Sequence, residues 1–307
     1  VWLSGFLGNA HHYFWVGTPE FWQFWGSLFS ALEPLPLILC FWHMYLDAHH
    51  DRKPLENAPA FYFLLGSAVL EMVGAGILGF TMTFAVTNVW SHGTWVTPSH
   101  AHLAMFGTFG MLGLGAAYYV IPHIRKATNF DQRFGQLAFW LVFIGMLGLA
   151  FAFAIGGTVQ VFVYRTLGLD WFGGDVFPAM GLYKAMLPAF GFLFLVGVLV
   201  IVFDLLTLGH RVRVREAAGA VAPYTPPTSG WSRPLTGFEA GIWLTAMWIF
   251  GFIITFGLLS FNLPRVQLGD PTLPYLAAGV GYPGLLLTTC LFVWRFLASL
   301  GARERAS

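Results

Sequence analysis

Two histidines separated by a single residue, His100 and His102, lie just inside a long apolar segment. On an α-helix each residue turns by about 100°, so positions i and i+2 point roughly 200° apart. Two imidazoles placed in this way cannot bind one metal ion, but each can bind a different metal centre on its own side of the helix. Buried histidines are costly in a membrane and indicate function. A helix between two haems would use this spacing.

The adjacent pair His11-His12 is a second candidate metal site. Gly8 and Gly17 flank the pair, so an irregular backbone at a helix end could turn both imidazoles onto one ion. Imidazole nitrogen suits iron, copper and zinc. A simpler interpretation is an interfacial pair of histidines, and we prefer a metal site because the pair is expected to share the depth of His100 and His102.

The elements that position these histidines are expected to be transmembrane helices. The chain is 57% hydrophobic and only 9% charged, with a mean hydropathy of +0.69, whereas soluble domains contain about 25% charged residues. The alternation typical of a membrane β-barrel is absent, and helices are the other way to satisfy the backbone in lipid. We predict an all-α, polytopic transmembrane helical bundle in contact with membrane lipid. The net charge of +1 indicates no nucleic-acid partner.

Seven apolar runs are separated by Pro, Gly and polar residues. They cover residues 18–45, 60–88, 99–122, 134–161, 179–208, 238–262 and 274–300.

The distribution of basic residues predicts how the bundle is oriented. Twelve of the fifteen Lys and Arg residues fall on one side, which the positive-inside rule makes cytoplasmic. Five histidines from segments distant in sequence then lie toward the outer face, and we expect them to form a single buried site. These histidines are His11, His12, His92, His100 and His102.

Two stretches carry a resemblance to a known family. They are GNAHHYFWVGTPEFWQFWGSLFSALEPLPL and, further along, SHGTWVTPSHAHLAMFG. Together they resemble the haem–copper oxidase superfamily and, within it, the large catalytic subunit of bacterial nitric oxide reductases. The resemblance covers about residues 1–208.

The resemblance implies a role for each motif residue. His100 would be the axial ligand of the high-spin haem b3, and His102 would bind the low-spin haem b. His11 and His12 would supply two ligands of a non-haem iron. Glu33 would match the family's glutamate near that iron.

The residues around Glu33 agree with a functional carboxylate, because a carboxylate among Leu, Phe and Pro in a membrane is costly. Near a reducing centre it could pass protons or tune the iron, and the alternative is a structural carboxyl that is hydrogen-bonded to neighbouring helices. For Glu71 a proton path and a structural role are equally open. His92 is expected to contact a haem propionate, with a simple loop histidine as the alternative.

The sequence departs from the family pattern in two ways. The family's third iron histidine, a second iron-binding glutamate and the other axial ligand of haem b lie upstream of the matched stretch, so we expect the chain to be the C-terminal part of a longer protein. The last two apolar runs extend beyond the family's usual end. We therefore divide the chain into catalytic helices over 1–208, a cytoplasmic loop over 209–236 and two additional transmembrane helices within 237–307.

The expected activity is the reduction of two nitric oxide molecules to nitrous oxide and water, in the bacterial inner (cytoplasmic) membrane. Electrons would come from an electron-donor subunit, a cytochrome c or a quinol. One alternative is a terminal oxygen reductase with copper in place of the non-haem iron. Another is a non-enzymatic membrane transporter with structural histidines, and a third is that this chain alone binds little haem.

Overall fold

The computed structural model describes residues 6–50, 57–127, 130–169, 176–208, 230–231 and 233–304. Within these ranges the chain contains helices and no strands, and seven helical segments are long and apolar enough to cross a membrane. The predicted all-α, polytopic helical bundle is therefore confirmed. The seven segments are Glu20–Asp47, Ala58–Met82, Val96–Ile124, Arg133–Thr166, Met180–Thr207, Gly237–Asn262 and Thr272–Leu300.

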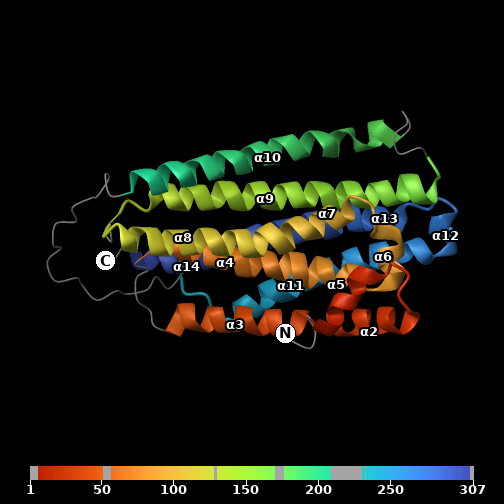
Figure 1. The fold of residues 1–307 in the computed structure, drawn as a ribbon, viewed down its shortest axis with the longest axis horizontal. Helices are drawn as coiled ribbons and strands as arrows, with labels where there is room; N and C mark the ends of the chain where they lie inside the picture. The colour runs from red at the N-terminus through yellow and green to blue at the C-terminus, as the bar shows by residue number, and fades with distance from the viewer. Residues whose placement is uncertain are drawn as a thin grey trace.

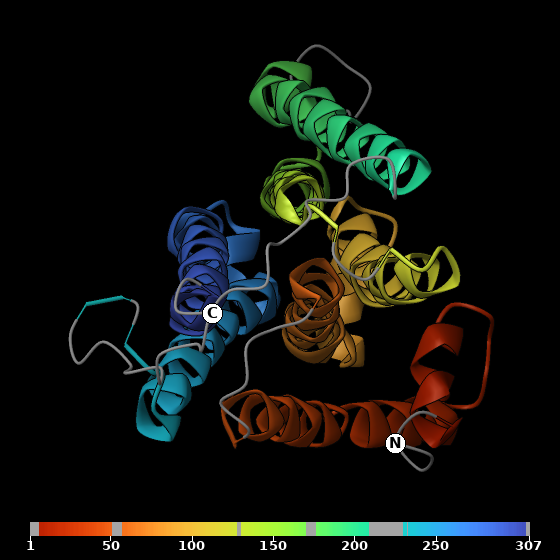
Figure 2. The ribbon, with the colours of Figure 1, turned by 90° about the vertical axis from the view of Figure 1, so that its left-hand side faces the viewer.

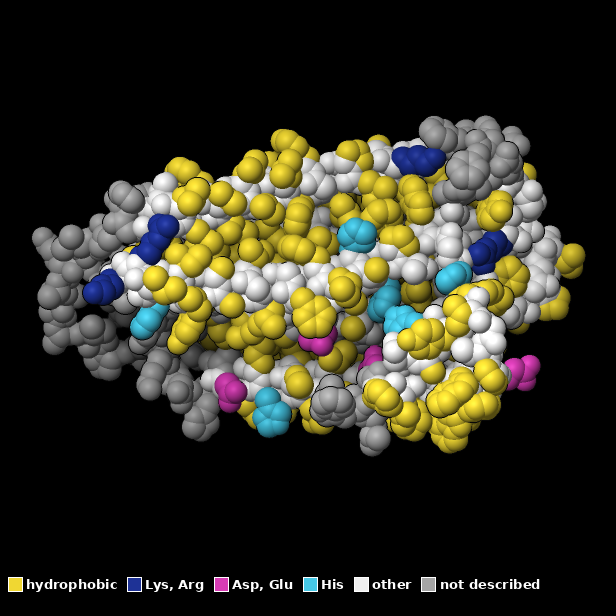
Figure 3. All heavy atoms as spheres, viewed as in Figure 1, with side chains coloured by type: hydrophobic (Ala, Val, Ile, Leu, Met, Phe, Trp, Pro, Cys, Tyr) yellow, Lys and Arg dark blue, Asp and Glu magenta, His cyan; other side chains and the backbone are white. Residues whose placement is uncertain are grey.

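The helices run along the long axis of the molecule, and α3, α8, α10 and α14 all end at its left side in Figure 1. Hydrophobic side chains cover the length of the face seen in Figure 3, whereas the Lys and Arg side chains visible there lie toward its two ends. This distribution is the one expected of a bundle whose middle lies in hydrocarbon. Most of the predicted loop over 209–236 lies outside the described residues.

The first span, predicted as an apolar run over 18–45, is interrupted next to Pro34, where proline is expected to kink a helix. A short 3₁₀ helix, η1 (Asn9–Tyr13), leads into α2 (Glu20–Ser30), and α3 (Pro34–His50) follows after a turn. Proline is well tolerated at the first position of a helix because it has no N–H to leave unsatisfied. The turn at residues 31–33 therefore ends one helix and lets Pro34 begin the next.

The second span is shorter than the predicted run over 60–88. It comprises α4 (Ala58–Glu71), the π-helical η2 (Met72–Leu78) and α5 (Gly79–Met82). The helix breaks at residues 83–84, and α6 (Ala85–Ser91) starts in a new direction. Side chains satisfy the carbonyls freed by this break: Thr87 donates to the Thr81 oxygen, and Asn88 donates to the Met82 oxygen. The predicted run does not end at this break because the residues on both sides of it are mostly apolar, so hydropathy does not mark the break.

The third span contains both histidines of the His100-Ala101-His102 motif. It is helical throughout, as predicted for 99–122, and consists of α7 (Val96–Ala101), the π-helical η3 (His102–Gly110) and α8 (Met111–Ile124). The wider π-helical turns therefore begin within the motif, and such turns often occur at functional sites.

The remaining helices surround the second span. Figure 2 shows α4 in the middle of the bundle and α10 at its edge. α10 packs along α9, where Gly145, Gly148 and Gly197 allow close contact between the two helices. The bounds are α9 (Arg133–Gln160), η4 (Val161–Thr166), α10 (Val176–Thr207), α11 (Gly237–Leu259), η5 (Ser260–Asn262), α12 (Pro264–Gln267), α13 (Thr272–Leu276), η6 (Ala277–Gly281) and α14 (Tyr282–Glu304).

Buried polar contacts join the last two spans to the rest of the bundle. The hydroxyls of Thr81 in α5 and Thr255 in α11 lie 2.9 Å apart, and Thr158 in α9 donates to the Tyr282 hydroxyl in α14 at 3.1 Å. Hydrogen bonds of this kind hold helices together in a membrane, where apolar contacts alone give little preference for protein over lipid. α11 and α14 are therefore integral parts of this bundle.

Candidate functional site: a histidine-lined cavity

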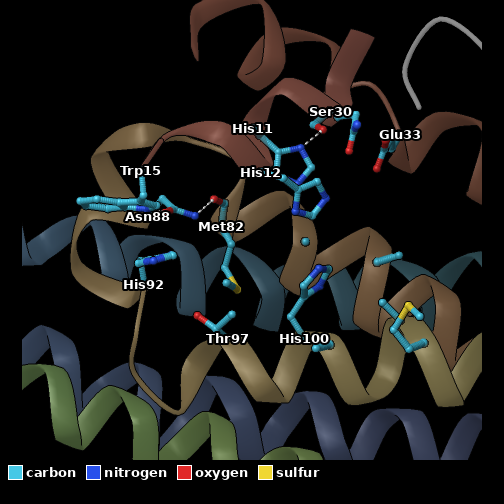
Figure 4. A pocket seen from close by; sticks show the side chains of 16 residues that line it. His11, His12, Trp15, Ser30, Glu33, Met82, Asn88, His92, Thr97 and His100 are labelled. Carbon is cyan, nitrogen blue, oxygen red and sulfur yellow. Dashed lines mark hydrogen bonds between the residues drawn. The ribbon is translucent and has the colours of Figure 1, made fainter. Parts of the chain in front are cut away.

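A cavity of about 470 Å³ lies between the N-terminal segment and the second and third spans. Figure 4 shows histidines entering it from opposite walls, with His11 and His12 above and His100 below. Its volume falls within the range of roughly 300–1,000 Å³ seen for small-molecule and cofactor sites. The lining residues are Asn9, His11, His12, Trp15, Ser30, Glu33, Ala75, Gly79, Met82, Asn88, His92, Thr97, His100, Ala101, Ala104 and Met105.

His11 and His12 lie in η1, and the centroids of their rings are 4.0 Å apart. The tight 3₁₀ turn brings both rings to the same wall of the cavity (Figure 4), as the sequence predicts for an irregular helix end. Burial, and then the charge of His12, lower the pKa of the His11 imidazole from 6.5 to about 4. Burial also lowers the pKa of His12. Both rings therefore favour the neutral form, which is the form that binds metals.

His100 points into the cavity from α7, toward His12. Its Nδ1 lies 2.8 Å from the carbonyl oxygen of Gly74 in η2. The backbones of η2 and η3 are very close here, because a Cβ added at Gly74 would overlap the Cβ of Leu103. The position of this imidazole is therefore fixed by a neighbouring span as well as by its own helix.

His102 lies on the other side of the same span. Its Nδ1 is 2.7 Å from the Pro98 carbonyl oxygen one turn earlier, and its ring centroid is 5.2 Å from that of Phe153 in α9. The expectation of one site for all five outer histidines therefore needs correction, since four line the cavity and His102 does not. The i, i+2 spacing explains this separation.

Three of these histidines share one hydrogen-bond pattern. The Nδ1 atoms of His11, His100 and His102 each lie within 2.8 Å of a backbone carbonyl oxygen. A carbonyl can only accept a hydrogen bond, so Nδ1 carries the proton and the lone pair of Nε2 is left free. Metal-binding histidines are usually held in this way, with the second nitrogen donating to a carbonyl or carboxylate.

Glu33 lies in the turn between α2 and α3 and faces the cavity. The turn is closed by a backbone hydrogen bond of 3.0 Å from the Glu33 N–H to the Ser30 oxygen. Glu71 does not belong to the cavity lining and immediately precedes the π-helical η2 instead. Only the first of these two glutamates is therefore placed beside the histidines.

His92 lines the outer part of the cavity, next to Trp15. The two rings are stacked with centroids 4.7 Å apart, and the Trp15 Nε1 donates to Asn88 Oδ1 at 2.7 Å. The guanidinium of Arg165 donates to the carbonyl oxygens of Val89 and His92. Burial, and then this guanidinium, lower the pKa of His92. These contacts hold the N-terminal segment against the loop that carries His92.

The side chains that line the cavity are of the types that bind haem iron and non-haem iron. Imidazole and carboxylate are both ligand types of non-haem iron, and His11, His12 and Glu33 line the same cavity. The small side chains of Ala75, Gly79 and Ala104 also line it, on the side of His100. Within the described ranges no three His, Cys, Asp or Glu side chains are placed to hold a metal ion by themselves. Within these ranges the predicted ligands therefore do not make up a complete metal site.

Sequence reasoning missed the groups that hold the histidines. Ser30 contacts His11 and lies three positions before Glu33, a spacing that could have suggested a shared site. No local sequence pattern predicts the contact of His100 with the Gly74 carbonyl or that of Trp15 with Asn88. Each of these contacts depends on packing between distant segments.

Comparisons with known proteins identify relatives of this chain. A nitric oxide reductase subunit of Stutzerimonas stutzeri is 33% identical over 167 residues, which are 53% of this chain and 35% of that protein. A cytochrome c oxidase subunit 1 homolog of Agrobacterium tumefaciens (strain T37) is 26% identical over 239 residues, which are 71% of this chain and 42% of that protein. The chain thus spans about a third to two fifths of these curated relatives.

A family model described as cytochrome c and quinol oxidase polypeptide I matches residues 1–187, which include every residue that lines the cavity. Together with the seven apolar helices, this match identifies a multi-pass membrane protein. The chain belongs to the cytochrome c and quinol oxidase polypeptide I family.

Proposed function

We propose that this chain carries the catalytic centre of a membrane nitric oxide reductase, an oxidoreductase that converts two nitric oxide molecules, two electrons and two protons into nitrous oxide and water. The observation that carries the proposal is the shared cavity of His11, His12, Glu33 and His100. A carboxylate in the cavity of the two imidazoles suits iron better than copper(I), and this favours a nitric oxide reductase over a copper-containing oxidase.

His100 would hold the high-spin haem b3, His102 the low-spin haem b, and His11 and His12 a non-haem iron. When bound, these groups would relay the electrons and provide the positions where nitric oxide binds. The electron donor would be a partner subunit, a cytochrome c or a quinol. Binding two reactants side by side in one cavity removes much of the entropic cost of their meeting.

The chain's own residues would orient the metal ligands and transfer protons. The Nδ1–H bonds to backbone carbonyls fix which nitrogen of His11, His100 and His102 is available. The carboxyl group of Glu33 faces the same space and can hold or deliver a proton there. His92 lies at the outer rim, where an imidazole could contact a haem carboxylate.

An oxygen reductase with copper at the His11-His12 site is the second candidate. The observation in its favour is the relative named as a cytochrome c oxidase subunit 1 homolog, whose similarity extends over 239 residues of this chain. The histidine arrangement is compatible with both activities. Measuring the bound metal and the gas that is reduced distinguishes them.

The test is metal and haem analysis of the purified holoenzyme, together with nitric oxide and oxygen consumption under the same reducing conditions. The proposal predicts b-type haem, iron in excess over haem, little copper, and faster consumption of nitric oxide than of oxygen. Copper in place of the excess iron, with faster oxygen consumption, would establish the oxidase. A preparation without haem absorbance would contradict both and favour a transporter.

A further inference from the structure

Ser30 occupies an unusual position behind the His11-His12 pair. It is the last residue of α2, it is buried, and its Oγ lies 2.6 Å from Nδ1 of His11. The same hydroxyl donates to the Gly8 carbonyl oxygen at 3.2 Å, and that oxygen also accepts the Nδ1–H of His11 at 2.7 Å. Imidazole, hydroxyl and carbonyl thus form a closed triangle of polar contacts, of which Figure 4 shows the one between His11 and Ser30.

Two glycines allow this triangle to form. A Cβ added at Gly26 of α2 would lie 2.5 Å from the backbone nitrogen of His11, and one added at Gly8 would lie 2.7 Å from Ser30 Oγ. The backbone of η1 therefore packs directly against α2. A five-residue 3₁₀ helix has little stability of its own, so the position of the histidine pair depends on α2.

We propose that Ser30 is a positioning residue for His11, and that its hydroxyl fixes the ring so that Nε2 faces the cavity and can bind a divalent transition metal ion. The inference rests on the proposed function, because it deepens the account of the same metal site. The Ser30 hydroxyl contacts Nδ1 of His11 and donates a hydrogen bond to the Gly8 carbonyl oxygen. It therefore lies on the Nδ1 side of the ring, away from Nε2.

The physical reason is the geometry of imidazole. Its two nitrogens are held at a fixed angle in one rigid ring, so a contact that restrains Nδ1 also directs the lone pair of Nε2. Loss of such supporting hydrogen bonds typically weakens metal binding by roughly 10–100-fold. Ser30 therefore should affect metal affinity much more than it affects haem content or folding.

Ser27 offers a matched control. It lies one turn earlier on the same helix, and its hydroxyl also donates to a backbone carbonyl, that of Thr83, at 2.8 Å. Ser27 does not line the cavity. Ser27→Ala and Ser30→Ala thus remove the same chemical group from the same helix, but only the second touches the histidine.

The experiment measures Co²⁺ binding to the holoenzyme after a chelator has removed its non-haem metal. Bound Co²⁺ is determined by equilibrium dialysis and elemental analysis, and haem absorbance serves as the measure of folding. We expect Ser30→Ala to weaken Co²⁺ binding by roughly 10-fold or more, Ser30→Thr to retain binding through its hydroxyl, and Ser27→Ala to bind as the parent does. Gly26→Ala should also weaken binding, because its Cβ displaces the backbone of His11.

His11→Ala separates this inference from the proposed function. If His11→Ala loses Co²⁺ binding while Ser30→Ala binds as tightly as the parent, Ser30 is a packing residue and the positioning role is wrong, whatever Gly26→Ala shows. If His11→Ala itself binds Co²⁺ normally, the metal site is elsewhere and the proposed function fails with the inference.

Discussion

The Nδ1 of His100 and the carbonyl oxygen of Gly74 lie 2.8 Å apart, across the contact between the second and third spans. The same carbonyl accepts the N–H of Gly79, so both of its lone pairs are used. Gly74 has no Cβ, and this absence lets η2 approach η3 closely enough for the bond to form. The orientation of a proposed haem ligand thus depends on the size of a residue in another span.

Gly74→Ala should therefore damage the site through packing. The added Cβ would overlap Leu103 and lie 2.9 Å from the Ala104 nitrogen, which forces the two segments apart and weakens the contact with His100. We expect a loss of stability of about 1–3 kcal/mol and an altered high-spin haem spectrum. Gly76→Ala is the control, because its Cβ would meet nothing closer than 3.5 Å. Equal effects of the two substitutions would show that the close approach at Gly74 is unimportant.

His100 and His102 should have separable effects on the two haems. Their rings lie on opposite sides of one span, so each substitution removes one metal ligand and leaves the other side intact. His102→Ala should remove the low-spin haem signal and retain high-spin haem, and His100→Ala should do the reverse. Optical and electron paramagnetic resonance spectra of the holoenzyme would measure this. The opposite pattern of losses would reverse the two assignments.

Glu33→Gln should reduce turnover much more than it affects folding. The substitution keeps the size of the side chain and its ability to hydrogen-bond, but it removes the exchangeable acid proton beside the histidines. General acid–base groups contribute on the order of 10²–10⁴-fold to rate, and we expect a loss in this range with near-normal haem content. Glu20→Gln, at an exposed position in the first turn of α2, is the control. Turnover at the parental rate in Glu33→Gln would make this carboxylate structural.

Arg295→Gln should destabilise the bundle without changing the haem spectrum. Arg295 is 2% exposed, its guanidinium pairs with Glu239 of α11 at 2.8 Å, and it also donates to the carbonyls of Trp231 and Arg233. Removing one partner of a buried pair costs about 3–5 kcal/mol when the other charge is left unpaired. Glu239 keeps its ion pair with Arg233 at 2.9 Å, so we expect a smaller loss of stability and a lower temperature of thermal unfolding of the holoenzyme.

Arg265→Gln provides the comparison for Arg295. Its contact with Asp270 is 3.7 Å long and the Arg265 side chain is exposed, and such surface pairs contribute about 0–1 kcal/mol. A change in the haem spectrum of Arg295→Gln would mean that the ends of α11 and α14 are coupled to the cavity, contrary to this prediction.

The spans and the candidate ligands could be predicted from local sequence. Hydropathy summed over about 20 residues locates a membrane helix without reference to any other part of the chain, and the seven predicted runs correspond to the seven observed segments. The separation of His100 from His102 is equally local, because the angle between positions i and i+2 is a property of the helix itself.

The groups that hold those ligands could be identified only in the folded chain. The contacts of His100 with Gly74, His11 with Ser30 and Trp15 with Asn88 join segments 19–73 residues apart, and no local pattern encodes them. The break at residues 83–84 is hidden for a related reason, since the surrounding sequence is mostly apolar and side chains of other helices bind the freed carbonyl oxygens of Met82 and Thr83. The break before Pro34, in contrast, is marked in the sequence by Pro34 and Pro36. Glu33 faces the same cavity as the histidines because the chain turns there, and only the folded chain brings that turn against the second and third spans.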